Sequence, residues 1–249
     1  MSVKFLPTNP CASIKARKTI RNPDEKFLNQ GSILYFYKMM QWRIYIEKLL
    51  KNHLPGESSH RKMLPPERNL HVPVPDVKNI KTSGVLMLIF PGGNEIYACL
   101  IKRTATMKVH AGQIGFPGGR QDKEDTTPCD TAIRETYEEL GLPSDSFTIL
   151  GELSPLYVPV SNFMIYPYVA WTNEKPKFHL NYNEVEKLLF FPILHHLVKS
   201  GVKNSEQETA SGKLVVPGIP LNGEFIWGAT AMILIEFLDV ISAGSFTPE

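Results

Sequence analysis

Three glutamates, Glu135, Glu138 and Glu139, stand close together in a stretch with helical character. Because an α-helix advances by about 100° per residue, their carboxylates share one face of it. Carboxylates this close repel one another, and a hard divalent cation such as Mg²⁺ or Mn²⁺ relieves that repulsion through oxygen ligands. Bound divalent cations commonly serve phosphate chemistry. The spacing therefore predicts a metal site that acts on phosphates.

The helix that must carry these glutamates has clear ends in the sequence. Thr127 can cap it, Pro128 suits the first helical position, and Asp130 completes a weak capping box. Gly141 supplies the stop. Three apolar side chains are expected on the face opposite the glutamates, packed on a sheet: Ile133, Tyr137 and Leu140.

A turn of sequence FPGG, residues 116–119, precedes the helix and lets the backbone approach a ligand closely. A carbonyl oxygen of this turn can join the glutamates as a metal ligand. Arg134 lies on the flank of the carboxylate face, where it can bridge to Asp125 or another acid of the loop. Such a bridge would hold the loop against the helix.

The pattern Gly119-(x5)-Asp125-(x8)-Arg134-Glu135-(x2)-Glu138-Glu139 followed by Leu-Gly-Leu resembles the Nudix box. It departs from the usual form in two ways. The loop has one extra residue before the arginine, and Asp125 stands in place of the first glutamate, with Glu124 as the alternative.

With these two departures, the sequence resembles the coenzyme A pyrophosphatase branch of the Nudix superfamily. The segment HAGQIGFPGGRQDKED, residues 110–125, is similar to the motif of that branch, which has the same lengthened loop. Lys102-Arg103-Thr104 and Ser161-Asn162-Phe163 resemble two of its flanking elements, with Asn162 in place of the usual glycine. The resemblance runs from about residue 60 to about residue 240.

The resemblance implies an α/β/α sandwich around a mixed β-sheet, and hydrolysis of a diphosphate linked to a nucleoside. Mg²⁺ or Mn²⁺ would be held by Glu135, Glu138 and Glu139 with the Gly118 carbonyl. Arg134 belongs to the same catalytic set. A glutamate from a later loop is expected as a further ligand or base, with Glu184 preferred over Glu186.

Coenzyme A carries a 3′-phosphate on its ADP half, so the branch implies basic groups beside the diphosphate loop. Arg103 ranks first among these, because arginine can grip a phosphate in bidentate fashion. The remaining residues expected to bind substrate are Lys102, His110, Gly118, Gly119, Arg120, Ser161 and Phe163. A structural role in the loop is favoured for His110. Other nucleoside diphosphates (ADP-ribose, NADH, a modified nucleotide) are the alternative substrates, and a non-catalytic nucleotide sensor is the alternative class.

Composition limits the other functions. The 249 residues have a formal net charge of only +2, which excludes polyanion binding by the chain as a whole and disfavours a nucleic-acid partner. The longest apolar runs are too short to span a bilayer, so no membrane partner is expected. The three cysteines are odd in number and have no zinc-like spacing, which disfavours disulfides and structural zinc and favours a reducing compartment. We expect a cytoplasmic protein with a small nucleotide substrate, and leave a homodimer open.

Residues 1–38 are expected to form an extension, and residues 39–249 a single Nudix domain with its core at about 80–240. The first 30 residues are basic and poor in acids, which allows a mitochondrial transit peptide and hence a matrix location. A disordered tail is favoured over that reading, and a natural start at Met39 or Met40 is the third alternative.

The rest of the chain is expected to alternate helices and strands. We expect strands at 85–90, 96–102, 149–153, 164–171 and 187–191, and helices at 33–50, 193–199 and 226–241. Segments 51–80, 104–119 and 200–213 are expected to be connectors or loops.

Overall fold

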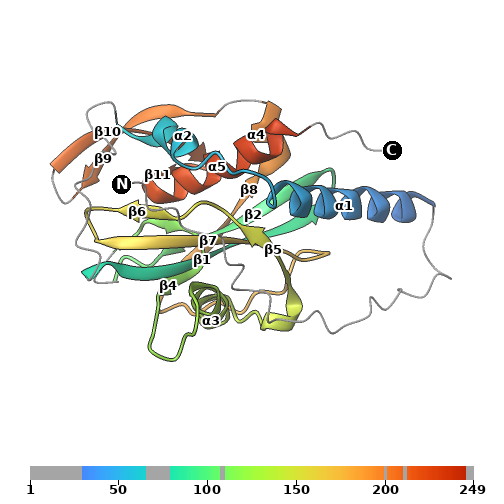
Figure 1. Ribbon diagram of the computed structural model, residues 1–249, viewed down its shortest axis with the longest axis horizontal. Helices are drawn as coiled ribbons and strands as arrows, with labels where there is room; N and C mark the ends of the chain where they lie inside the picture. The colour runs from blue at the N-terminus through green and yellow to red at the C-terminus, as the bar shows by residue number, and fades with distance from the viewer. Residues whose placement is uncertain (1–29, 66–78, 107–109, 199–200, 210–211, 245–249) are drawn as a thin grey trace.

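The computed structural model of the protein describes residues 30–65, 79–106, 110–198, 201–209 and 212–244 (Figure 1). An eight-stranded mixed sheet forms its centre. The central strands β1 and β7 pair in parallel, and the other pairings in this sheet are antiparallel. The strands of this sheet are β1 (Lys81–Gly92), β2 (Glu95–Arg103), β3 (Ile114–Gly115), β4 (Gly118–Arg120), β5 (Thr148–Glu152), β6 (Leu156–Val158), β7 (Phe163–Trp171) and β8 (Val185–Pro192).

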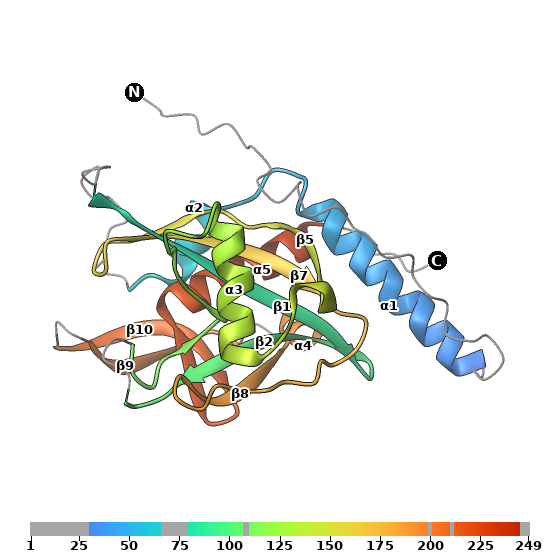
Figure 2. The same ribbon diagram turned by 90° about the horizontal axis from the view of Figure 1, so that it is seen from below.

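Helices cover both faces of the sheet, so the predicted α/β/α sandwich is confirmed. In Figure 1, α3 lies below the sheet while α2, α4 and α5 lie above it, and Figure 2 shows α3 lying across β1 and β2. The helices are α1 (Gln30–Leu49), α2 (Glu57–His60), α3 (Pro128–Leu140), α4 (Ile193–Val198) and α5 (Gly228–Ala243). None of the described helices is long and apolar enough to cross a membrane.

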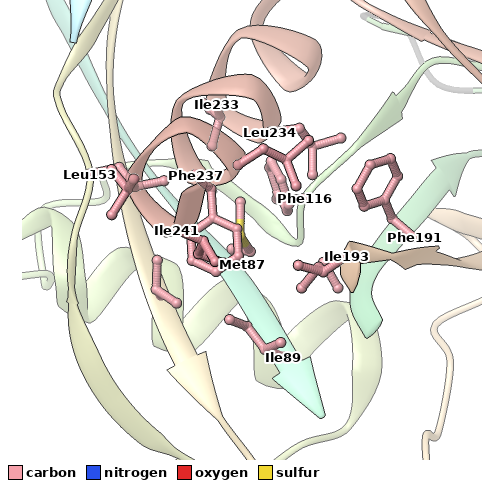
Figure 3. Packing of buried hydrophobic residues seen from close by; sticks show 14 of the residues in the cluster. Met87, Ile89, Phe116, Leu153, Phe191, Ile193, Ile233, Leu234, Phe237 and Ile241 are labelled. Atoms are coloured by element: carbon pink, nitrogen blue, oxygen red, sulfur yellow. The ribbon is translucent and has the colours of Figure 1, made fainter. Parts of the chain in front are cut away.

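Strand β1 shows why the sheet needs a helix on each side. Its side chains alternate between two hydrophobic clusters, since successive residues of a strand point to opposite faces. Met87 and Ile89 join the cluster under α5, where Figure 3 shows Met87 beside Phe237. Leu86 belongs to the second cluster, under α3, together with Leu88 and Phe90. A strand buried on both faces reads as a continuous apolar run, which is the pattern of residues 85–90.

The strands expected at 85–90 and 96–102 are present as β1 and β2, which pair as a hairpin around the turn Gly93–Asn94. The strands expected at 149–153, 164–171 and 187–191, and the helices expected at 33–50, 193–199 and 226–241, are present with shifts of up to three residues in their ends. Cys99 is fully buried in β2 as a free thiol. Cys129 is disulfide-bonded, which goes against the expectation that disulfides are disfavoured, and the reducing compartment stays a prediction.

Three segments expected to lack regular structure contain it. The expected loop at 104–119 contains β3 and the start of β4. Residues 57–63, in the expected connector, form α2 and the 3₁₀ turn η2 (Arg61–Met63), which pack on α5. The segment 200–213 contains β9 (Lys203–Thr209) and the start of β10 (Gly212–Leu221), which form a second, antiparallel sheet with β11 (Glu224–Trp227). β9 is polar throughout, so it lacks the apolar alternation that identifies a strand in a sequence.

Helix α1 begins at Gln30 and runs across the expected boundary between residues 38 and 39. Its buried side chains Met39, Trp42 and Ile46 belong to the cluster under α5. Residues 1–29 lie outside the described residues, and so do the expectations of a tail or transit peptide. The division at residue 38 stays a prediction.

Candidate active site

The ends of α3 form as its sequence predicts. The Thr127 hydroxyl accepts from the Asp130 N–H at 3.2 Å, and the Asp130 carboxylate accepts from the Thr127 N–H at 2.8 Å, which completes the capping box. At the other end Gly141 caps the helix with φ 66°, and its N–H donates to the Tyr137 carbonyl. These caps fix the start and the end of the helix that carries the three glutamates.

The face that α3 turns to the sheet differs from the expected one. Cys129, Ala132, Thr136 and Leu140 are buried there, whereas Tyr137 is 59% exposed and its expected packing is wrong. Small side chains let the helix approach β1 closely, and a Cβ added at Gly84 would lie 1.9 Å from the Pro128 carbonyl oxygen. The rotation of the helix also carries one glutamate of the trio to the buried side.

That glutamate is Glu139, whose side chain is fully buried. Its two carboxylate oxygens accept from the Gly118 N–H and from the Arg103 guanidinium, each at 3.0 Å. Burial nevertheless raises the pKa of Glu139 to about 8. Arg103 and the Gly118 N–H lower this pKa, whereas the charges of Glu135 and Glu184 raise it further. The protein thus holds a carboxylate where its charge is unfavourable.

The turn at residues 116–119 brings the backbone against the helix. Gly118 has φ 150°, and a Cβ there would lie 2.4 Å from the Gly84 carbonyl oxygen. A Cβ at Gly119 would lie 2.4 Å from the carboxyl carbon of Glu135. Both positions therefore need glycine, one for the fold of the turn and the other to leave room for a carboxylate. The Gly118 carbonyl as a metal ligand stays a prediction.

Arg134 bridges to Asp125, as predicted. Its Nε and Nη2 donate to the Asp125 carboxylate at 3.1 and 2.9 Å, and its Nη1 lies 2.9 Å from Glu135 and 3.1 Å from Glu138. The hydrogen bond from Arg134 lowers the pKa of Asp125. The same guanidinium donates to the Arg120 carbonyl at 3.3 Å. Asp125, and not Glu124, therefore anchors the lengthened loop to the helix.

Glu184 lies close enough to the trio for its charge to raise the pKa of Glu135 and Glu139. The loop before β8 is docked on the C-terminal end of α3: the N–H groups of His179 and Asn181 donate to the Leu140 and Glu139 carbonyls. Nothing in the sequence pattern signals this docking. Glu186, the second choice in the sequence, instead pairs with Lys102 at 3.4 Å.

The chemistry of these donors fits a hard divalent cation. Burial first, and then the charges of Glu138 and Glu184, raise the pKa of Glu135 against the lowering effect of Arg134. Within the described ranges, however, no group of three or more His, Cys, Asp or Glu side chains is gathered around one point as a metal requires. Arg103 and Arg134 hold the carboxylates instead. The donor set is present, and arginines occupy the oxygens that a metal would take.

The other residues expected to bind substrate are dispersed. Lys102 forms ion pairs with Glu224 at 3.0 Å and with Glu186. His110 is exposed, and its Nδ1 lies 2.7 Å from the Gln113 side-chain oxygen within the same loop, in line with the structural role favoured for it.

Ser161 and Phe163 lie at the turn from β6 into β7. The Ser161 hydroxyl donates to the Val158 carbonyl at 3.4 Å, and Asn162 takes a left-handed conformation with φ 56°. The Lys81 ammonium lies 5.4 Å from the centre of the Phe163 ring. Lys81 and Arg120 line a cavity of about 480 Å³ together with Lys123. Neither lysine was singled out in the sequence, because Lys81 stands outside the motifs and Lys123 occupies an unspecified position within the motif of residues 110–125.

The model of the NUDIX domain matches residues 80–209, more than half of the chain. The chain belongs to the Nudix family. It is 34% identical over 143 residues to the uncharacterized Nudix hydrolase NudL of Pectobacterium atrosepticum, across 57% of this chain and 74% of that one. A probable Nudix hydrolase of Schizosaccharomyces pombe is 29% identical across 79% of this chain and 72% of its own length. The peroxisomal coenzyme A diphosphatase ndx-8 of Caenorhabditis elegans is 36% identical across 46% of this Nudix chain and 50% of its own.

Proposed function

We propose that this Nudix protein hydrolyses the diphosphate of coenzyme A or an acyl-CoA, giving 3′,5′-ADP and (acyl-)4′-phosphopantetheine. The observation that carries the proposal is the bridge from Arg134 to Asp125. It shows that the loop with one extra residue, typical of the coenzyme A branch, assembles on the glutamate helix. The similarity to a chain named as a coenzyme A diphosphatase supports the same substrate class.

In the reaction, the oxygen of a water molecule bonds to one phosphorus while the bond from that phosphorus to the bridging oxygen breaks. The bridging oxygen leaves with the other phosphate, and the proton lost by water balances its charge. Glu135, Glu138 and Glu139, with the Gly118 carbonyl, would hold Mg²⁺ or Mn²⁺, which when bound neutralises the diphosphate and acidifies water. Glu184 is the proposed base or additional ligand, and its closeness to Glu135 and Glu139 supports that role.

Arg103 and Arg134 position the carboxylates. Each guanidinium lies within 3.1 Å of a glutamate of the trio, so each can orient that carboxylate and offset part of the repulsion among them. With a cation bound at these carboxylates, Arg103 would be free to contact a phosphate oxygen. We therefore keep Arg103 as the first candidate for gripping the diphosphate.

A substrate panel tests the proposal. The purified protein is incubated with Mg²⁺ or Mn²⁺ and CoA, acyl-CoAs, ADP-ribose, NADH or deoxynucleoside triphosphates, and products are identified by mass. Formation of 3′,5′-ADP from CoA is expected. Cleavage of ADP-ribose or NADH alone would overturn the CoA proposal in favour of another diphosphate, and unchanged behaviour in Glu138→Gln would indicate a nucleotide sensor. The cytoplasmic location and the homodimer stay predictions.

A further inference from the structure

The cavity of about 480 Å³ beside the lengthened loop is lined by three cations. We propose that it binds a phosphate monoester, and that Lys81, Arg120 and Lys123 are its ligands. This inference rests on the proposed function in one respect: for a coenzyme A substrate, the monoester is the 3′-phosphate of the ADP half. The remaining lining residues are Asn79, Ile80, Thr82, Gln121 and Asp122.

The two sides of the cavity are held together by backbone pairing. Ser83 of β1 pairs with Arg120 of β4, and the Gln121 N–H donates to the Thr82 carbonyl at 2.9 Å. The Lys81 N–H donates to the Asn162 carbonyl, so the β6–β7 turn is tied to the same edge. Lys81 and Arg120 therefore project from strands whose backbones are paired, and Lys123 follows in the turn after β4.

The three cations differ from the other basic residues near the carboxylates. Lys102, Arg103, Arg134 and Lys187 each form an ion pair with a glutamate or aspartate. Lys81, Arg120 and Lys123 form none with any carboxylate of the described residues. Three cations around one cavity repel one another, and an anion bound between them relieves that repulsion.

The only carboxylate in the lining is that of Asp122. Its Oδ1 accepts from the Lys123 N–H at 2.7 Å, so part of its charge is directed to the loop backbone. With three cations and one carboxylate, the lining has a positive net charge. A phosphate monoester carries between about one and a half and two negative charges near neutral pH, so it gains more from this charge than a singly charged diester does.

The position of Arg120 links the cavity to the chemistry. Arg120 follows Gly119, whose Cα faces the Glu135 carboxylate, and its own carbonyl accepts from Arg134. Successive residues of a strand point to opposite faces, so the Arg120 side chain leaves β4 on the face opposite Glu135, and the cavity is connected to the carboxylates through the loop after β4, whose Gln121 and Asp122 line it. A nucleotide with its diphosphate at the carboxylates would reach this cavity with a second phosphate, on its ribose, along that loop.

The test compares ligands that differ only in this phosphate. Binding of 3′,5′-ADP and 5′-AMP is measured by calorimetry with EDTA present, and kcat/KM is measured for CoA and 3′-dephospho-CoA. The wild-type protein is expected to prefer the 3′-phosphorylated member of each pair by about tenfold or more, since one charge-assisted hydrogen bond accounts for that factor. In Lys81→Gln/Lys123→Gln the preference should vanish. Arg120→Lys should keep part of it, since the charge remains.

Lys51→Gln/Lys213→Gln is the matched control, because it removes two exposed lysines that pair with Glu47 and Glu206 and do not line the cavity. It should keep the full preference. A wild-type protein that does not discriminate, or a preference that survives in Lys81→Gln/Lys123→Gln, would overturn the proposed subsite. If CoA is cleaved without such a preference, the subsite fails and the proposed function stands. If 3′,5′-ADP is preferred while CoA is not cleaved, the function fails and the subsite stands.

Discussion

Two fully buried glutamates, Glu139 and Glu236, lie on the helices that cover opposite faces of the sheet. Glu236 of α5 accepts from the Gly56 and Ser154 N–H groups, each at 3.2 Å, and lies 2.9 Å from His60 Nε2. It joins α2 and the segment before β6 to α5. Every partner of this carboxylate is a neutral donor or a histidine, and the arrangement serves the fold.

Glu139 of α3 is equally buried, but it stands among like charges. It has two donors, Gly118 and Arg103, and its pKa is raised by burial and by the charges of Glu135 and Glu184. Burial alone therefore does not distinguish a functional carboxylate from a structural one. The difference lies in whether the surroundings favour the charge, and a site that keeps an unfavourable charge is a candidate for function.

The largest expected effect is on catalysis by Glu139→Gln. The amide would remove a proposed metal ligand, so kcat for the best substrate should fall by about a hundredfold to a thousandfold, the range for losing one well-placed electrostatic group. The measurement is initial rate with saturating Mg²⁺, with Glu124→Gln, an exposed loop acid, as the control that keeps full activity. If Glu139→Gln were as active as this control, Glu139 would not be a functional carboxylate.

The corresponding change in the other glutamate, Glu236→Gln, should affect folding. The amide oxygen can still accept from Gly56 and Ser154, and the amide nitrogen then faces His60 Nε2. All three hydrogen bonds lose their charged acceptor, however, which together costs about 2 kcal/mol in the free energy of unfolding. Urea denaturation measures this loss, and the rate per folded molecule should stay at the wild-type value. Normal stability with lost activity would reverse the two roles.

The glutamates around Glu139 could be predicted from the sequence, whereas the role of Glu236 could not. The caps and the spacing of Glu135, Glu138 and Glu139 are local, so a pattern of some 15 residues was enough to predict the helix and its acids. Glu236 was not singled out, because its partners Gly56 and Ser154 are brought to it only by tertiary packing. The burial of Glu139 was missed for a related reason: Tyr137 was assigned to the sheet-facing side.

The cavity, too, could not be predicted from the sequence. Lys81 and Lys123 are 42 positions apart in the sequence. They meet because β4 pairs with β1, which no spacing rule reveals. Glu184 was proposed from the family resemblance, and the docking of its loop on α3 explains how it reaches the other glutamates.

Metal binding should stabilise the folded protein only where Glu139 of α3 is intact. A cation that binds only the folded protein adds about 1.4 kcal/mol to the free energy of unfolding at ten times its dissociation constant. Thermal unfolding with and without Mn²⁺ should show this gain in the wild-type protein and in Glu236→Gln, but not in Glu139→Gln. An equal gain in all three proteins would place the cation elsewhere.

Asp125 sharpens the comparison, because it is a nearly buried carboxylate on the catalytic side whose charge is favoured. Its side chain is 6% exposed, and Arg134, Thr131 and the Asp122 N–H all donate to it. If satisfaction of the charge decides the role, Asp125 should behave like Glu236. Asp125→Asn should then lower the free energy of unfolding by about 1 kcal/mol, the net value of such a hydrogen-bonded group.

The pH dependence of this loss has a definite sign. Arg134 lowers the pKa of Asp125 below its ordinary value of 3.8, so the folded state favours the charged form. The stabilisation is complete above that pH and is lost as the pH falls through the lower pKa of the folded state. The difference in stability between wild type and Asp125→Asn should therefore be constant near neutral pH and shrink below pH about 4. A difference that instead grows in acid would show that Asp125 is held against its charge, as Glu139 is.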